Sequence, residues 1–257
     1  MQVDQISYGS VKRRNMKGYQ VIGKSHGVDA ALSGAFCRWA PSHSALEGAP
    51  DEAGEDAWAV SFFPVSESRF AITRTVHGGP EYSGRGGLTV MTTALLIAAD
   101  QFAQYDNHAI DVARTAMALG HLILRPDSSE SLPTVTMPKT PLALRLPVSD
   151  WSDAATPRLP AHAVQWVARE SCSLLRDDRR VMIVGPCDPL PILTLLLDQL
   201  SAEERPRISF ACGLKPSNRR EFRLQFTHQE MTPKLQRELA RQGIEAIDLV
   251  RVLAETR

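Results

Sequence analysis

The residues with the clearest chemical potential lie near the N-terminus and match the bare pattern of a phosphate-binding loop. Residues 18–25, GYQVIGKS, satisfy GxxxxGKS. In a working loop the first glycine follows a buried strand, and the lysine begins a long helix. Here residues 13–17 are polar, residues 19–22 are bulky and strand-like, and Gly27 interrupts a helix. We therefore interpret the segment as a strand ending in a turn, with Lys24 and Ser25 as a weak alternative cofactor-binding pair.

Nucleophilic catalysis would need a serine or cysteine beside a base, with an oxyanion hole. The sequence has no GxSxG motif, and a combination of Cys37, His77 and Asp100 is one of many that seven histidines permit. His26, His43 and His77 flank glycine-rich turns, but no short-spaced pair among them anchors a metal. The sequence therefore assigns no catalytic residue, no cofactor and no metal ligand.

Two other stretches suggest binding surfaces. Residues 74–87 form a glycine-dense stretch in which a small anionic signal could be held near Arg74, His77 and Arg85. Residues 207–217 are a strand running into a basic turn, which can grip phosphate or an acidic protein surface. The turn has no interleaved aromatic residues for stacking bases, which makes nucleic acid an unlikely partner. The predicted partner- or ligand-binding residues are Arg74, His77, Arg85, Lys215, Arg219 and Arg220.

Charge and cysteine usage narrow the class of protein. The 257 residues contain 29 basic and 29 acidic side chains, so no global field attracts nucleic acid or an anionic membrane. The four cysteines are widely spread without metal-ligand spacing, which is typical of reduced thiols. The first residues show no secretory signal, and the longest apolar stretch, 89–99, is about half of what a membrane span needs. The sequence predicts a soluble, cytoplasmic protein without a membrane partner.

The periodicity of the first half predicts two hairpins and two helices. Residues 88–96 are either a buried strand or the start of a helix, because periodicity cannot separate the two over so short a run. The other expected elements are strands 5–12 and 18–25, a helix over 30–39 capped by Asp29, strands 57–64 and 69–75 joined by a turn at 65–68, and a helix over 108–119 capped by Asp106 or Asn107.

The second half predicts alternating helices and strands. The expected elements are an edge strand over 142–146, a helix over 161–176, a strand over 180–185, a helix over 190–200, strands over 208–212 and 222–226, and a last helix from the Thr232 cap, with a break near Gly243, to Ala254.

Residues 125–160 hold seven of the seventeen prolines and are expected to link two lobes, 1–124 and 161–257. The predicted fold is α/β (α+β), with mixed sheets, packed helices and two lobes joined by this proline-rich segment.

Three groups of segments carry a resemblance to a known family. They are residues 8–11 with 18–25, residues 57–74, and residues 207–217 leading to Phe222-Arg223-Leu224. The chain resembles the N-terminal module of bacterial GTPase-associated proteins, which are found beside small GTPases and other NTPases in predicted conflict or defence loci. The resemblance implies a non-enzymatic adaptor or sensor that couples to a GTPase or an effector. It supplies no catalytic residue that can be carried over.

Two hypotheses of different classes follow. The first is an interaction module that binds a partner GTPase, another NTPase or an effector in a bacterial defence or signalling system. The alternative is a nucleotide-binding or hydrolytic enzyme that uses residues 18–25 and a nearby histidine.

Overall fold

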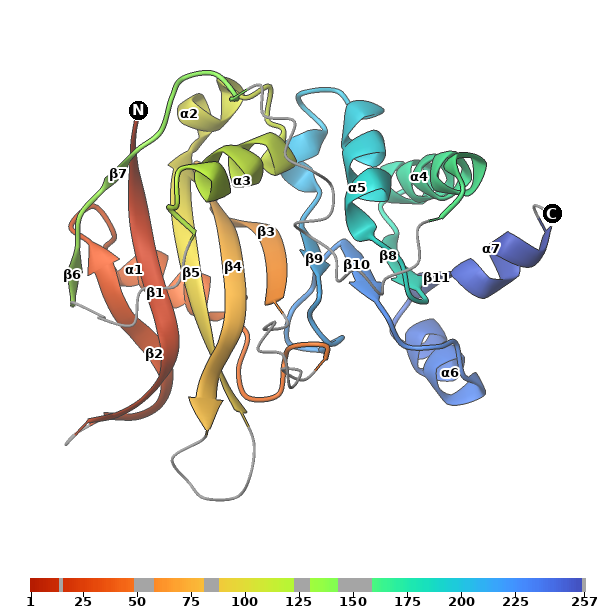
Figure 1. Ribbon diagram of the computed structural model, residues 1–257, viewed down its shortest axis with the longest axis horizontal. Coiled ribbons are helices and arrows are strands. Elements are labelled where there is room, and N and C mark those ends of the chain that lie inside the picture. Colours follow the sequence, from red (N-terminus) through yellow and green to blue (C-terminus); the bar gives the residue numbers. More distant parts are fainter. Residues whose placement is uncertain (14–15, 49–57, 81–87, 123–129, 143–158, 256–257) are drawn as a thin grey trace. The chain divides into compact units, whose positions relative to one another are not determined.

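The computed structural model describes residues 1–13, 16–48, 58–80, 88–122, 130–142 and 159–255 (Figure 1). The chain divides into two compact units, and the first also includes a short segment from late in the sequence. Unit 1 comprises residues 1–143 and 213–221, and unit 2 comprises residues 144–212 and 222–257. Mixed sheets with packed helices confirm the predicted α/β class. The proline-rich segment 125–160 and the edge strand expected over 142–146 lie largely outside the described residues.

The sheet of unit 1 is built mainly from antiparallel neighbours. Its order is β3-β4-β5-β1-β2-β6; the β2–β6 pair is parallel, and β7 pairs with β1. The strands are β1 (Gln2–Arg13), β2 (Met16–Ser25), β3 (Trp58–Ser66), β4 (Arg69–Pro80), β5 (Leu88–Ala98), β6 (Ser131–Leu132) and β7 (Val135–Thr136). Both predicted hairpins are confirmed.

Strand β5 resolves the ambiguity over residues 88–96. It pairs with β4 on one side and β1 on the other, so its backbone groups are used by two ladders. Leu95, Leu96 and Ile97 are all fully buried, which requires apolar cover on both faces of the sheet. The continuous apolar run is therefore a central strand.

Helices cover both faces of the unit 1 sheet. Phe62 and Phe63 are consecutive on β3 and therefore point to opposite faces. Phe63 lies 5.8 Å from Phe36 of α1 (Ala30–Cys37), whereas Phe62 lies 5.2 Å from Phe102 of α2 (Ala99–Ala103), measured between ring centroids. We call these the α1 face and the α2 face.

The helix caps of unit 1 follow the sequence only in part. Asp29 caps α1 as predicted, its Oδ1 accepting a hydrogen bond from the Leu32 N–H at 2.7 Å. The cap predicted for α3 (Ala109–Ala118) is wrong: it is His108, whose Nδ1 accepts from the Asp111 N–H at 3.3 Å. Asp106 and Asn107 instead adopt left-handed backbone angles in the preceding turn, a conformation that Asp and Asn tolerate well.

Segment 213–221 is tied to unit 1 by a glycine and two backbone hydrogen bonds. Gly213 has a φ of 77°, and a Cβ at this position would lie 2.7 Å from the Trp58 carbonyl oxygen. The Glu47 N–H donates to the Gly213 carbonyl at 2.9 Å, and the Lys215 N–H donates to the Ala45 carbonyl at 2.8 Å. Residues 213–215 thus run beside residues 45–47, and Gly213 lies so close to β3 that a side chain at this position would clash with the Trp58 carbonyl.

Unit 2 is a parallel sheet with helices between its strands. Its order is β11-β8-β10-β9. The elements are α4 (Ala161–Arg176), β8 (Arg180–Val184), α5 (Pro189–Asp198), the 3-10 turn η2 (Arg205–Arg207), β9 (Phe210–Cys212), β10 (Leu224–Thr227), α6 (Pro233–Arg241), β11 (Ile244–Asp248) and α7 (Leu249–Glu255). Helix α4 matches its predicted bounds. None of the helices in the described part of the chain has the length and apolar character needed to cross a bilayer.

The last helix, predicted from the Thr232 cap to Ala254 with a break near Gly243, is wrong over residues 244–248. Helix α6 ends at Arg241, Gly243 takes a left-handed φ of 65°, and residues 244–248 form a strand that pairs in parallel with β8. The buried residues of that strand, Ile244 and Ile247, are three apart, a spacing that resembles a helical face. Pairing with β8 along the whole strand overrides this local pattern.

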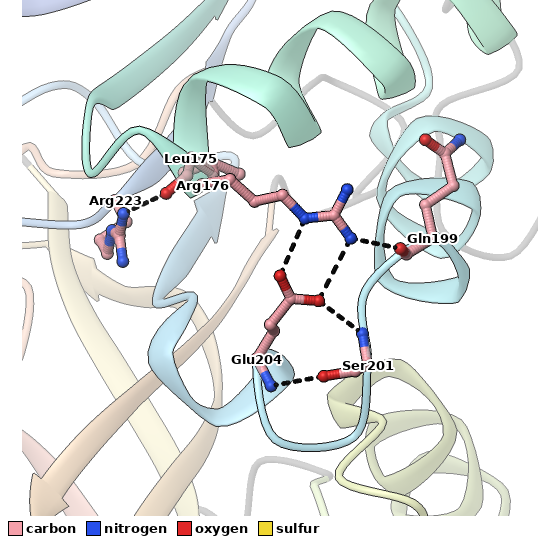
Figure 2. A network of polar contacts seen from close by, with 6 residues as sticks. All are labelled: Leu175, Arg176, Gln199, Ser201, Glu204 and Arg223. Carbon is pink, nitrogen blue, oxygen red and sulfur yellow. Dashed lines mark hydrogen bonds and ion pairs between the residues drawn. The ribbon is translucent and has the colours of Figure 1, made fainter.

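A polar network joins the C-terminal ends of α4 and α5 in unit 2 (Figure 2). Arg176 donates from Nε and Nη2 to the two carboxylate oxygens of Glu204, at 2.8 and 3.2 Å, and from Nη2 to the Gln199 carbonyl at 2.9 Å. The Ser201 N–H donates to Glu204 Oε2 at 2.8 Å, and the Glu204 N–H donates to Ser201 Oγ at 3.3 Å. The hydrogen bonds from Arg176 and then Ser201 lower the pKa of Glu204 to about 2.

This network predicts a stability difference that depends on pH. Because the folded-state pKa lies below the unfolded value of about 4.3, ionised Glu204 stabilises the fold at neutral pH, and this contribution fades as the pH falls towards about 2. Glu204→Gln should lower the thermal midpoint at neutral pH, with a gap that closes in acid. The exposed Glu230 offers a matched control, Glu230→Gln, expected to be nearly neutral throughout. An unchanged Glu204→Gln gap at low pH would contradict this assignment.

The close approach of Gly213 to β3 predicts that a side chain at this position lowers the stability of the fold. Gly213→Ala incurs the cost of a left-handed alanine, about 1–2 kcal/mol, and a clash with the Trp58 carbonyl worth roughly 1–3 kcal/mol more. Gly79→Ala is the matched control in the same unit, because Gly79 has a φ of 92° but open space around its would-be Cβ. Denaturant unfolding should rank Gly213→Ala clearly below Gly79→Ala. Equal losses would show that the close approach does not constrain the fold.

Candidate functional site

The two stretches singled out in the sequence meet at residues 45–48. The His77 Nε2–H, on β4, donates to the Gly48 carbonyl at 3.4 Å. On the other side, Glu47 and Ala45 form the backbone hydrogen bonds with Gly213 and Lys215. Leu46 and Leu214, both buried, complete an antiparallel bridge. We call residues 45–48, His77 and residues 213–219 the junction surface.

Arg74 and His77 do not share a site. They are three residues apart on a regular stretch of β4, opposite Thr93 and Val90 of β5, so their side chains point to opposite faces. Arg74 packs its guanidinium over the Trp58 ring, 5.2 Å from the ring centroid, in a cation–π contact. His77 therefore contacts residues 45–48, which also bind residues 213–215, whereas Arg74 lies on the other face of the sheet. Arg85 lies outside the described residues.

The three predicted basic residues of the turn are in different environments. The side chains of Lys215 and Arg219 are exposed, whereas Arg220 is only 6% exposed. Arg220 Nη2 donates to the Lys215 carbonyl at 2.9 Å, but its Nε has no hydrogen-bond partner among the described residues. No carboxylate pairs with Arg220 in the described part of the chain. Burial lowers the pKa of Arg220, because a buried guanidinium loses its hydration.

Tyr8 of β1 is close enough to this buried cation for the two groups to influence each other's pKa. Its ring centroid is 5.9 Å from that of Tyr19 and 6.0 Å from that of Phe36 on α1. Burial, followed by the proximity of Cys37 and Tyr19, raises the pKa of Tyr8 to about 12, while Arg220 acts in the opposite direction. The Tyr8 hydroxyl therefore stays protonated at any physiological pH and is available as a hydrogen-bond donor.

Sequence reasoning missed Tyr8 as a candidate functional residue. Tyr8 lies on β1 opposite Thr92 of β5, and its ring packs against Phe36 on the α1 face of the sheet. The electrostatic interaction with Arg220 links two residues more than two hundred positions apart in the sequence, so no local pattern could reveal it. Its inclusion in the segment 8–11 that carried the family resemblance was the one available signal.

The α1 face also carries pairs of buried hydroxyls, which are structural. Ser61 and Thr73 approach to 2.7 Å, and Thr75 and Thr92 to 2.9 Å, each pair spanning two neighbouring strands. Each hydroxyl thereby satisfies the other in an otherwise apolar layer. This is the geometry of cross-strand stabilisation rather than of an activated nucleophile.

Residues 18–25 lie in β2, with a geometry unlike that of a phosphate-binding loop. Gly23 pairs with Ser7 in the ladder, and the next helix, α1, begins only at Ala30. Ser25 is fully buried; its Oγ accepts from the Gln5 N–H at 2.8 Å and donates to the Pro133 carbonyl at 3.0 Å. The serine hydroxyl thus fastens β2 to β1 and to the segment around residue 133.

The other constellations considered from the sequence are not assembled. Cys37 belongs to α1 and Asp100 to α2, which cover opposite faces of the sheet. Burial raises the pKa of the Cys37 thiol, which disfavours the nucleophilic thiolate. His26 and His43 are exposed. Among the residues that the structure describes, no group of three His, Cys, Asp or Glu side chains is placed to hold a metal ion.

Comparisons with known proteins agree with this picture of unit 1. No curated protein and no solved structure matches the chain. One family model does match, that of GTPase-associated protein 1, N-terminal domain type 2, over residues 2–138. The match covers more than half of the 257 residues and runs from β1 through β7. The resemblance inferred from the sequence is thereby confirmed, and the chain belongs to the family of GTPase-associated protein 1, N-terminal domain type 2.

Proposed function

We propose that this protein is a non-enzymatic adaptor or sensor module that binds a partner GTPase, another NTPase or an effector in a bacterial defence or signalling system. The observation that carries the proposal is the family match over residues 2–138, whose name links this kind of domain to GTPases. The working compartment is the cytoplasm, where such partners reside and where widely spread cysteine thiols stay reduced.

The junction surface is the proposed contact for the partner. Lys215 and Arg219 are exposed cations on a turn whose backbone is held by the hydrogen bonds to residues 45–47. A turn held in this way loses little conformational entropy on binding, which favours affinity. These two exposed cations give the turn a local positive charge that suits an acidic protein surface. The partner is a protein rather than a nucleic acid or a membrane.

The alternative function, a nucleotide-binding or hydrolytic enzyme, would use Lys24, Ser25 and a nearby histidine. The geometry favours the adaptor instead. Ser25 Oγ is hydrogen-bonded to the Gln5 N–H and to the Pro133 carbonyl, and Lys24 Nζ lies 3.4 Å from Ser33 Oγ on α1. Backbone N–H groups that pair in a strand ladder cannot converge on a phosphate.

The adaptor function predicts the outcome of a nucleotide titration. Fluorescently labelled ATP and GTP should show no saturable binding that depends on Lys24, so wild type and Lys24→Ala should behave alike. Ser25→Ala should instead lower the free energy of unfolding by about 1–3 kcal/mol, because the buried Gln5 N–H loses its acceptor. Tight nucleotide binding that Lys24→Ala abolishes would overturn the adaptor proposal.

The proposed surface predicts which charges the partner requires. The double change Lys215→Glu with Arg219→Glu should weaken binding to a candidate partner GTPase from the same organism about tenfold or more, chiefly through slower association at low salt. The matched control is Lys234→Glu with Arg241→Glu, which makes the same charge change at two exposed positions of α6. Biolayer interferometry with the immobilised GTPase, loaded with GDP or a GTP analogue, measures both.

The control must bind as wild type does for the result to count towards the junction surface. Equal weakening by the two double variants would indicate a non-specific charge effect and contradict the proposed surface. Absence of binding to any NTPase encoded nearby would count against the adaptor function itself.

A further inference from the structure

The most unusual charge in unit 1 is the guanidinium of Arg220. Arginine is rarely buried unless a carboxylate or another acceptor compensates its charge. At 6% exposure Arg220 has lost nearly all of its hydration, and its Nη2 donates to the Lys215 carbonyl as its one side-chain hydrogen bond within the described residues. A carbonyl is a dipole and does not neutralise a full positive charge. Burial of this uncompensated charge therefore lowers the stability of the fold, and packing alone gives no reason for an arginine at this position.

The unused donors of Arg220 suit an oxyanion. Nε–H lacks an acceptor among the described residues, and the planar fork of a guanidinium matches two oxygens of a carboxylate or a phosphate. The Tyr8 side chain is near enough to influence the pKa of Arg220 and supplies a hydroxyl that stays protonated. Arginine and tyrosine donors together could replace the hydration shell of a bound anion.

The local charge favours an anion with more than one negative charge. Lys215, Arg219 and Arg220 place three cations within six residues, beside the exposed carboxylate of Glu221 and the half-buried Glu47, whose N–H donates to the Gly213 carbonyl. A carboxylate would neutralise Arg220 alone, whereas a phosphate dianion would also interact with the two exposed cations. Charge-assisted hydrogen bonds to such an anion are short and strong.

We propose that Arg220 anchors a binding site in unit 1 for a small phosphate-type dianion, either inorganic phosphate or the phosphate of a small phosphomonoester. The site uses a buried residue of the turn, whereas the contact with a partner protein uses the exposed residues Lys215 and Arg219. It therefore does not depend on the adaptor function. Occupation of the site would neutralise the buried charge and stabilise the turn that presents the junction surface.

The test is a calorimetric titration of the full chain with inorganic phosphate, and in a second arm with glycerol 3-phosphate. Wild type should bind saturably, and its thermal midpoint should rise with phosphate concentration. Arg220→Gln should weaken binding about tenfold or more, whereas Arg219→Gln, the same change on the exposed neighbour, should weaken it only about two- to threefold. A stronger response to glycerol 3-phosphate than to phosphate would identify a phosphomonoester as the ligand source. Acetate at equal ionic strength should have little effect.

Stability in the absence of phosphate separates an anion site from a purely structural role for Arg220. If Arg220 serves to bind an anion, Arg220→Gln should then be as stable as wild type or more so, because an uncompensated buried charge is removed. If Arg220 is structural, Arg220→Gln should be destabilised. A destabilised Arg220→Gln in a protein whose wild type ignores phosphate would overturn the proposal, as would equal loss of binding in the Arg219 and Arg220 variants. If Arg220→Gln does not fold, the Nε–H resonance of Arg220 in wild type decides the matter. It should shift on addition of phosphate, and an unmoved resonance would refute the site.

Discussion

The close approach of Gly213 to β3 is the constraint on which the proposed surface depends. With no Cβ and a left-handed φ of 77°, this residue lets the chain turn directly against the Trp58 carbonyl. The turn brings residues 213–215 alongside residues 45–47, where two backbone hydrogen bonds and the Leu46–Leu214 bridge hold them. The position of the basic turn, including the burial of Arg220, follows from this contact.

Local patterns in the sequence predicted most of the secondary structure. Alternation identified the hairpins of β1 with β2 and of β3 with β4, and an amphipathic pattern identified α4 at its observed bounds. Strands β6, β7 and β11 were not predicted, because each is defined by a distant partner rather than by its own residues. Two residues of β6 or β7 carry no readable period, and the three-residue spacing of the two buried isoleucines in β11 resembles a helix.

The candidate site was predictable in its parts but not in its assembly. Composition alone drew attention to His77 and to the basic turn, yet their shared neighbour, residues 45–48, has no distinctive residue types. Basic turns are usually solvated, so the burial of Arg220 could not be expected, and neither could its proximity to Tyr8. The GxxxxGKS match was interpreted as a strand ending in a turn, and residues 18–25 do lie in β2, because the pattern lacks its strand–loop–helix context.

Recognition of a partner protein through the junction surface is tested most directly by hydrogen exchange of the full chain with and without a candidate partner GTPase from the same organism. The bound partner should slow exchange of amides in residues 45–48 and 213–219, while the amides of α6 exchange as before. Slowed exchange confined to other segments, or none at saturating GTPase, would contradict it.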